Sequence, residues 1–274
     1  MNKQELSNLI DYYKQELEFD EFAPRTIKKY IVDAKRFIDF LDHNHDIDKN
    51  DAIEYKSMLM DKYKAKSVNS YLISLNKFLK YAKVDELVLK MLKIQEEYSF
   101  GDIINDQEYR RLMKYAESSG DIQLLMIMKV IKSSGCRISE IRFVTAEAIY
   151  ETRYKDTFIP IRSKGKNRMI IITNKTRNEL LHYCKSKRLE SGPIFTYSYS
   201  TIWRHMKKVA GLAKINKDKV YPHIFRHYFA KLYLQNYSNS ISELADILGH
   251  SSIETTRIYT RTTNEEKRRK MEQL

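Results

Sequence analysis

Apolar residues recur at three- and four-residue spacing through most of this chain, the repeat that gives an α-helix one buried face. Residues 26–41 and 66–83 show the repeat clearly. In the first of these segments the repeated positions are Ile27, Tyr30, Ile31, Ala34, Phe37, Ile38 and Leu41. One stretch departs from the pattern: TFIPI at 157–161 and MIIIT at 169–173 are β-branched runs on either side of the basic turn RSKGKNR. We therefore predict a mainly α-helical fold with one small β-hairpin.

The helical repeat lapses between residues 95 and 101, where a glycine appears in KIQEEYSFGD. A new helix is expected to begin at Asn105 or Asp106, since either side chain can cap it and Glu108 lies in its first turn. A chain of 274 residues is long enough for two domains. We place the domains at residues 1–97 and 98–274.

The excess of positive over negative charge lies in the second of these segments. Residues 1–100 hold 17 Lys and Arg against 18 Asp and Glu, which leaves 32 against 18 for the rest of the chain. A net charge of +14 on one part of a protein indicates a polyanion partner, usually nucleic acid and less often an anionic membrane face. Composition alone fits a basic protein without such a partner equally well.

Other sequence features argue against export and metal binding. No run of 18 apolar residues occurs, the N-terminus begins polar, and two cysteines cannot form a disulfide framework. We expect a reducing cytoplasm as the location. The cluster of His43, His45, Asp46 and Asp48 is expected to form a solvated turn, because no second group of ligands follows at a metal-site spacing. Neither a metal nor another cofactor is expected.

Several cations stand next to turns or share helical faces. Each has an ordinary explanation, such as an ion pair between Arg137 and Glu140 or a solvated lysine turn. If they converge, guanidiniums, an ammonium and imidazoles would bind a phosphodiester and stabilise the charge of its transition state. These residues are Arg137, Lys164, Lys166, His223, Arg226 and His250.

A phosphoryl transfer of this kind needs a nucleophile. Tyr259 stands nine residues after His250 in a polar, threonine-rich segment. Forming a phenolate at pH 7 from a tyrosine of pKa about 10 costs roughly 4 kcal/mol, and nearby cations lower that cost. Tyr259 is our candidate nucleophile.

Four segments, in this order, resemble motifs of the tyrosine recombinases, or phage integrase family, of the Xer-like and mobile-element integrase type. GCRISEI is similar to the first arginine motif, SKGKNR to the lysine hairpin, HIFRH to the H-x-x-R-H motif, and LGHSSIETTRIYT to the segment that ends in the tyrosine. Residues 1–97 resemble the family's helical core-binding (SAM-like) domain. The resemblance implies a C-shaped clamp on DNA.

The resemblance implies a site-specific DNA recombinase that cleaves and rejoins strands through a 3′-phosphotyrosyl intermediate, without metal or ATP, in DNA integration, excision or dimer resolution. Arg137 and Arg226 would bind the phosphate with His250, and Tyr259 would attack it. His223 would accept the tyrosine proton, with His227 in a supporting place. Lys164 would protonate the leaving 5′-hydroxyl, with Lys166 as its alternative, because Ser163 stands where the family usually has glycine before the lysine.

DNA contacts are expected from three places: the polar face of the helix at 66–83, the hairpin, and the segment SYSTIWRHMKKVAGLAK, which resembles the family's major-groove helix. Trp203 is expected to be a packing anchor of that helix. The candidate DNA-binding residues are Lys66, Asn69, Ser70, Lys77, Lys166, Arg168, Arg204, Lys207 and Lys208.

The expected partner is double-stranded DNA with inverted half-sites, bound by a homo-tetramer on two sites. We expect this assembly in the cytoplasm, at the nucleoid. Accessory factors are compatible with it, and no membrane is expected to take part. The tail at 264–274 would dock on a neighbouring subunit. We expect no additional arm-binding domain before the helical domain, which would favour simple sites, as in dimer resolution or a small mobile element. Two alternatives stay open: a nicking-closing enzyme resembling type IB topoisomerases, and a catalytically silent DNA-binding accessory factor.

Overall fold

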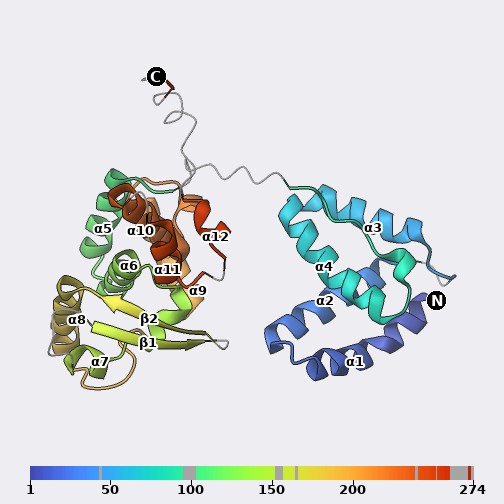
Figure 1. Cartoon of the computed structure of the whole chain (residues 1–274), viewed down its shortest axis with the longest axis horizontal. Helices are drawn as coiled ribbons and strands as arrows, with labels where there is room; N and C mark the ends of the chain where they lie inside the picture. The colour runs from blue at the N-terminus through green and yellow to red at the C-terminus, as the bar shows by residue number, and fades with distance from the viewer. Residues whose placement is uncertain are drawn as a thin grey trace. The chain divides into compact units, whose positions relative to one another are not determined.

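The computed structural model describes residues 1–42, 45–94, 103–151, 157–163, 166–237, 240–250, 252–259 and 271–272, apart from the side chains at 162, 163, 166 and 167. The chain forms two compact units, residues 1–97 and residues 98–274 (Figure 1). Within the described residues, no helix is both long and apolar enough to cross a membrane.

The first unit is a helical bundle of α1 (Lys3–Phe19), α2 (Pro24–Phe40), α3 (Lys49–Lys62) and α4 (Ala65–Tyr81), followed by the short 3-10 helix η1 (Asp85–Leu87). Local signals set the helix starts. Asn2 and Asp48 cap α1 and α3 through reciprocal hydrogen bonds, and Pro24 opens α2. The predicted helices at 26–41 and 66–83 are confirmed as α2 and α4.

Aromatic rings fill the centre of this bundle. Tyr13 of α1 contacts Phe78 of α4 with ring centroids 5.1 Å apart, and Phe37 of α2 meets Tyr55 of α3 edge to face at 5.2 Å. All four rings are essentially inaccessible to solvent. Because each helix contributes one of these rings, the four helices share a single core.

The second unit is mainly helical and holds one antiparallel hairpin. Its elements are α5 (Asp106–Ser118), α6 (Ile122–Ser134), η3 (Ile138–Phe143), α7 (Ala146–Tyr150), β1 (Thr157–Ser163), β2 (Lys166–Ile172), α8 (Asn174–Ser186), α9 (Tyr199–Leu212), η4 (Lys217–Lys219), α10 (Pro222–Asn236), α11 (Ile241–Leu248) and α12 (Glu254–Arg257). The apolar helix α6 is the central one and packs against α5, α8, α9, α10 and β2. Asn105 caps α5 and pairs with Glu108, as predicted.

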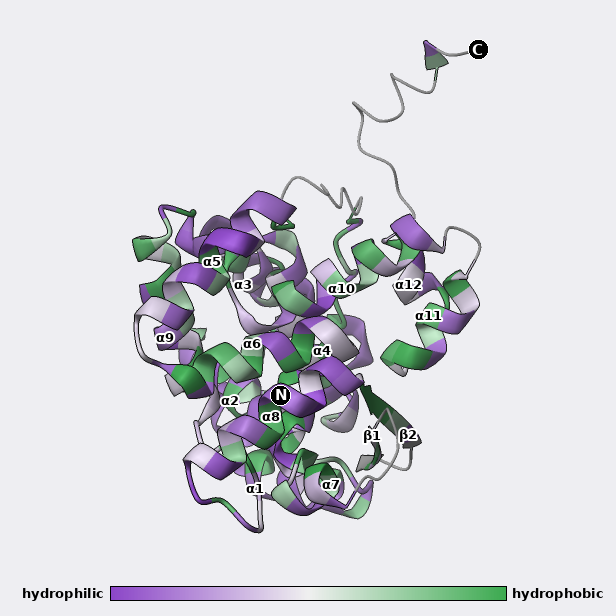
Figure 2. Cartoon of the chain, turned by 90° about the vertical axis from the view of Figure 1, so that its left-hand side faces the viewer, coloured by the Kyte–Doolittle hydropathy of each residue, from purple (hydrophilic) through white to green (hydrophobic). Residues whose placement is uncertain are grey.

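The β-hairpin pairs Thr157 with Ile172 at one end and Ser163 with Lys166 at the other. Both strands therefore extend further towards the turn than expected. Isoleucines on one face are buried, whereas Phe158, Met169 and Ile171 are exposed on the other face, and the strands are coloured as hydrophobic in Figure 2. Since side chains alternate along a strand, Arg168 lies on the buried face, opposite Ile161.

Two left-handed glycines end the helices that lead into the candidate site. Gly135 ends α6 with φ of 63°, and Gly249 ends α11 with φ of 62°. A Cβ at Gly135 would lie 2.6 Å from a ring carbon of Phe229, so the chain approaches α10 closely there. Arg137 follows the first glycine by two residues, and His250 follows the second directly.

Candidate active site

Arg226 of α10 lies at the centre of the candidate site. It is only 3% exposed, and its guanidinium donates from Nη1 to the Gly135 carbonyl at 2.7 Å and from Nη2 to the Leu248 carbonyl at 2.7 Å. Nη2 also lies 3.0 Å from Nε2 of His250. Burial, followed by the charges of Arg137 and Arg168, lowers the pKa of Arg226 to about 10, so it stays charged at pH 7. One arginine thus joins the ends of α6 and α11.

Arg137 lies beside this arginine, at the N-cap of η3. Its Nη1 donates to Glu140 Oε1 at 3.0 Å, and its Nη2 donates to the Gly249 carbonyl at 2.8 Å. The side chain is about one-third exposed. Arg137 therefore forms the ion pair with Glu140 that we considered as its ordinary role, and it also lies beside Arg226, as the phosphate-binding cluster requires. The exposed part of Arg137 leaves a guanidinium edge that an incoming anion can reach.

His250 is held as a neutral imidazole with a fixed tautomer. Its Nε2 accepts from Arg226, and its Nδ1 donates to Thr256 Oγ1 at 2.7 Å. Burial and then the positive charges of Arg226, Arg137 and Arg168 lower its pKa to about 4. The same contacts hold the imidazole against Arg226.

Tyr259 lies within this part of the unit and is 7% exposed. Its hydroxyl is 2.5 Å from Nδ1 of His227, whose pKa is lowered to about 4 by burial, by His223 and by Arg226. His223, the expected proton acceptor, is exposed, and its ring centroid lies 6.4 Å from that of His227. Part of its surface is exposed, and desolvation of the rest, followed by the charges of Arg226 and Arg137, lowers the pKa of His223. In this state the tyrosine contacts the histidine that we expected only to support the site.

Two predicted features lie outside what the structure describes. Lys164 is one of the undescribed residues, and of Lys166 only the backbone, at the start of β2, is described. Most of the tail at 264–274 also falls outside the described residues. The role of general acid and the docking of the tail remain predictions.

Three of the residues that we predicted to contact DNA have partners within the protein. Arg168 is 12% exposed and bound to Glu140, because its register turns it inwards. The Asn69 side chain exchanges two hydrogen bonds with the backbone of Leu92, at 2.9 and 2.8 Å. Lys77 pairs with Asp20 at 3.2 Å. Arg168, Asn69 and Lys77 thus have structural partners in the free protein, and their contact with DNA stays a prediction.

Most of the other candidate DNA-binding residues are exposed or partly exposed, as a contact with DNA requires. Arg204 and Lys208 are exposed on α9, and Lys66 is exposed on α4, whereas Ser70 is half-buried. Lys207 donates to the Lys217 carbonyl and lies 4.9 Å from the ring centre of Trp203. Trp203 itself is 45% exposed, so the expectation of a packing anchor is wrong. Its large side chain stands on the exposed face of α9.

The His/Asp turn before α3 has structural partners. Asp48 accepts from the backbone of Asn50 and Asp51, and Asp46 pairs with the amino group of Met1 at 2.9 Å. Across the described parts of the chain, no group of three or more His, Cys, Asp or Glu residues could hold a metal ion. His43 lies outside those parts.

Comparisons with known proteins agree with this arrangement. Residues 102–266 match the phage integrase family, and residues 9–88 match the phage integrase N-terminal SAM-like domain. Tyrosine recombinase XerA of Pyrococcus horikoshii is 23% identical over 278 residues, which cover 97% of this chain and 93% of that protein. A tyrosine recombinase of Pseudothermotoga lettingae is 28% identical over 287 residues, covering 96% and 95%.

Solved structures share the fold. Lambda integrase bound as a dimer to a COC′ core site aligns with a TM-score of 0.75 at 16% identity, covering 95% of this chain and 96% of that one. Lambda integrase as a tetramer on a Holliday junction aligns with a TM-score of 0.73 at 17% identity, covering 96% and 80%.

A helical SAM-like unit followed by a mixed unit with clustered arginines and a tyrosine defines a DNA strand-transfer enzyme of the integrase type. The chain belongs to the phage integrase family, and within it to the tyrosine recombinases. It is a site-specific recombinase, and neither the topoisomerase-like nor the catalytically silent alternative is favoured.

Proposed function

We propose that this recombinase cleaves one DNA strand by attack of Tyr259 Oη on the scissile phosphate. The Oη–P bond forms as the bond from phosphorus to the 5′-oxygen breaks, which gives a 3′-phosphotyrosyl link and a free 5′-hydroxyl. Rejoining reverses these steps, and the link conserves the energy of the phosphodiester, so no ATP is needed. The convergence of Arg137, Arg226, His250 and Tyr259 from four separate segments supports this function.

The arginines and His250 would bind the non-bridging phosphate oxygens. Arg226 is prepositioned by two carbonyls, so little side-chain entropy is lost when it meets a phosphate. His250 accepts a hydrogen bond from Arg226 in the free protein. An incoming phosphate anion would favour the protonated imidazole, which then donates from Nε2.

Two protons must move in the cleavage step. The hydroxyl of Tyr259 is buried against His227, so the tyrosine must leave this contact to reach a phosphate on DNA. Its proton would then pass to His223, whose exposed imidazole stands at the start of α10. Lys164 would give a proton to the departing 5′-oxygen, with Lys166 as the alternative.

The DNA partner is inferred from charge and from relatives that are seen on DNA. We infer double-stranded DNA with inverted half-sites, bound by four copies on two sites, with the tail of one copy on its neighbour. The exposed Arg204 and Lys208 of α9 support DNA binding by the second unit. We infer a location at the nucleoid from the DNA partner, and the two cysteines, which are free and buried, suit a reducing cytoplasm.

A suicide-substrate assay tests the function. Nicked duplexes that carry the recombination site are incubated with the wild-type protein and with Tyr259→Phe, in the presence of EDTA. We expect a denaturation-resistant protein–DNA adduct with the wild type alone. An adduct that also forms with Tyr259→Phe would assign the nucleophile to another residue, and an adduct that EDTA abolishes would contradict metal-free cleavage.

A further inference from the structure

The carbonyl groups of the last two residues of α11 and that of its glycine cap each accept a hydrogen bond from a different arginine. A helix C-terminus has unpaired carbonyls and partial negative charge, which makes it a favourable site for cations. The three arginines come from β2, α10 and the start of η3, which are distant in sequence. The pairs are Arg168 Nη1 with Ile247, Arg226 Nη2 with Leu248 at 2.7 Å, and Arg137 Nη2 with Gly249 at 2.8 Å.

Two of these arginines belong to the phosphate site, and Arg168 has a second set of contacts. Its Nε donates to Glu140 Oε1 at 3.2 Å, and its Nη2 donates to Glu140 Oε2. The same carboxylate accepts from the backbone N–H of Arg137 at 2.6 Å and from Arg137 Nη1 at 3.0 Å. Glu140 is 4% exposed, so these hydrogen bonds are shielded from competing water. Arg168 is therefore coupled to Arg137 through one buried carboxylate.

Arg168 packs directly against Gly249. A Cβ on Gly249 would lie 2.5 Å from Cδ and 3.1 Å from Nε of Arg168, so the glycine makes room for this side chain. The guanidinium lies on the buried face of β2, four residues after Lys164. The hairpin, the Arg137 loop and the segment that carries His250 meet at this one side chain.

Resting on the phosphoryl transfer proposed above, we propose that Arg168 is a positioning residue of this recombinase, which fixes Arg137, His250 and strand β2 in one arrangement without touching DNA. Replacing it would remove its two hydrogen bonds to the Glu140 carboxylate and its hydrogen bond to the Ile247 carbonyl, and it would leave Arg137 as the donor to Glu140. Arg137 would then turn towards Glu140 and away from the phosphate. Loss of its charge would also raise the pKa of His250, since Arg168 is one of the charges that lower it.

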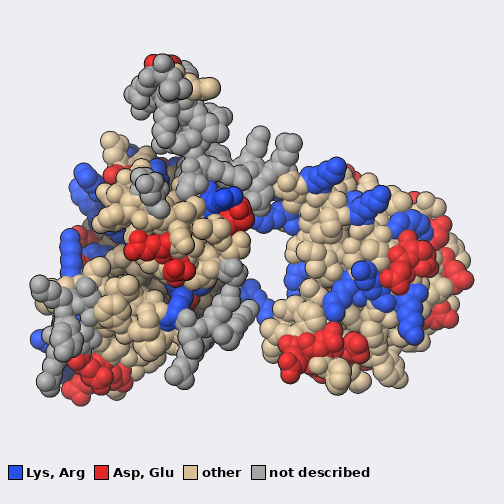
Figure 3. All heavy atoms as spheres, in the orientation of Figure 1, with Lys and Arg blue, Asp and Glu red and all other residues tan. Residues whose placement is uncertain are grey.

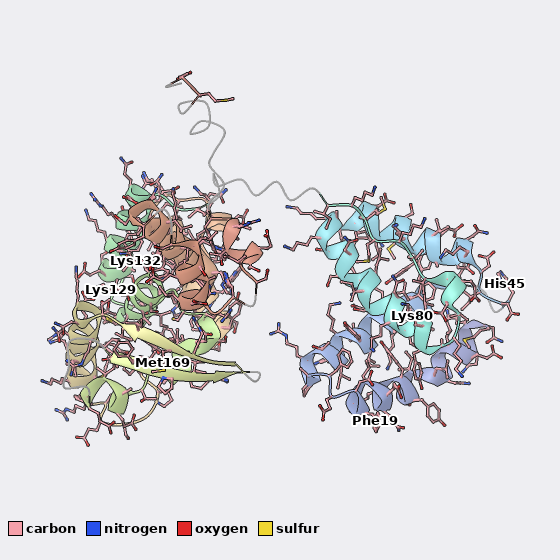
Figure 4. All side chains as sticks on the ribbon, viewed as in Figure 1. Phe19, His45, Lys80, Lys129, Lys132 and Met169 are labelled. Atoms are coloured by element: carbon pink, nitrogen blue, oxygen red, sulfur yellow. The ribbon has the colours of Figure 1, made fainter. Side chains whose placement is uncertain are left out.

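The experiment compares Arg168→Gln and Arg168→Lys with Met169→Ala as the matched control. Met169 is the next residue of β2, 46% exposed on the opposite face of the hairpin, and is labelled in Figure 4. Adduct formation is measured in single turnover at saturating DNA, and DNA affinity is measured against salt. We expect Arg168→Gln to lower the cleavage rate by about 100-fold, with unchanged affinity and salt slope. Met169→Ala should cleave at the wild-type rate.

A DNA contact would give the opposite pattern. Its loss would lower the salt slope by about 1 and weaken binding, with the rate at saturation preserved. Either that result or a wild-type rate in Arg168→Gln overturns the inference. Arg168→Lys keeps the positive charge beside Glu140, so it should be more stable to unfolding than Arg168→Gln. A lysine cannot reach Glu140 and Ile247 together, so cleavage by this variant should stay slower than that of the wild type.

A readout that does not depend on activity separates positioning from general stability. In the free, folded full-length protein, NMR titration of His250 should show a higher pKa in Arg168→Gln than in the wild type. An unchanged titration would contradict the inference even if the variant were slow. If the wild type formed no adduct, the proposed function would fail, and the titration would still decide whether Arg168 sets the state of His250.

Discussion

At the scale of single residues, the site is built from imidazoles that are kept neutral. Burial and neighbouring cations lower the pKa of His227 and of His250 to about 4, against a value near 6.5 in the unfolded chain. Between pH 6.5 and 4 the unfolded chain therefore binds more protons than the folded one. The free energy of unfolding of the second unit should fall as the pH falls through this window.

His227→Gln tests this sign. Glutamine cannot titrate there, so between pH 7 and pH 5 the variant should lose about 1–2 kcal/mol less unfolding free energy than the wild type. Urea denaturation of the full chain at both pH values measures the difference. His182→Gln, at an exposed position of α8, is the control. An identical loss in the wild type and in His227→Gln would show that His227 is not the buried neutral group described here.

Sequence could identify these histidines but could not show which of them meets the tyrosine. His223 and His227 stand one helical turn apart and share a face of α10, and Tyr259 follows 32 residues after His227. The tertiary packing of α12 on the end of α11 decides the contact. The order of the motifs predicted which residues form the site. The hydrogen bonds between them depend on distances in the folded chain, and these cannot be read from the number of residues between the motifs.

At the scale of elements, the glycine cap of α11 has to satisfy two requirements. Gly249 adopts φ of 62°, which costs other residues about 1 kcal/mol, and it also makes room for Arg168. Gly120 has φ of 73°, and a Cβ added there would have no atom within 4 Å. The two positions therefore separate backbone strain from steric contact.

Gly249→Ala should destabilise the protein by more than Gly120→Ala does, and it alone should slow adduct formation. The backbone cost, about 1 kcal/mol, is common to both variants, whereas the contact with Arg168 Cδ exists only at Gly249. Thermal unfolding and single-turnover cleavage are the measurements. Equal effects of the two variants on both would mean that the close approach of Arg168 has no energetic consequence.

The burial of Arg168 in the hairpin could be predicted from the local sequence pattern, whereas the partner of Asn69 could not. The basic residues around the turn indicated DNA contacts. Side chains alternate between the two faces of a hairpin, however, so the buried positions of Ile159, Ile161 and Ile170 place Arg168 on the buried face as well. That signal was present in the sequence. The partner of Asn69 was not, because Leu92 lies 23 residues away and offers only its backbone. An amide on a helix surface has the same sequence signature whether it meets DNA or a neighbouring loop.

At the scale of the whole molecule, the two units carry different charge. Residues 1–97 contain 17 Lys and Arg and 18 Asp and Glu, and Figure 3 shows both signs on the face of this unit. The excess of positive charge belongs to residues 98–274. Attraction to the DNA backbone should therefore come chiefly from the second unit, whereas the first would contribute by shape and by local contacts.

The salt dependence of DNA binding tests that division. Arg204 and Lys208 are exposed one turn apart on α9, so both can face one DNA backbone. Replacing either with alanine should reduce the slope of log K against log salt by about 0.9, and the double variant by about twice that, because each phosphate contact releases its own counterions. Lys14→Ala is the control, since Lys14 is exposed on α1 and pairs with Glu18. A double variant with the wild-type slope would place the DNA-binding surface elsewhere than α9, and a reduced slope in Lys14→Ala would show that the first unit shares the electrostatic term.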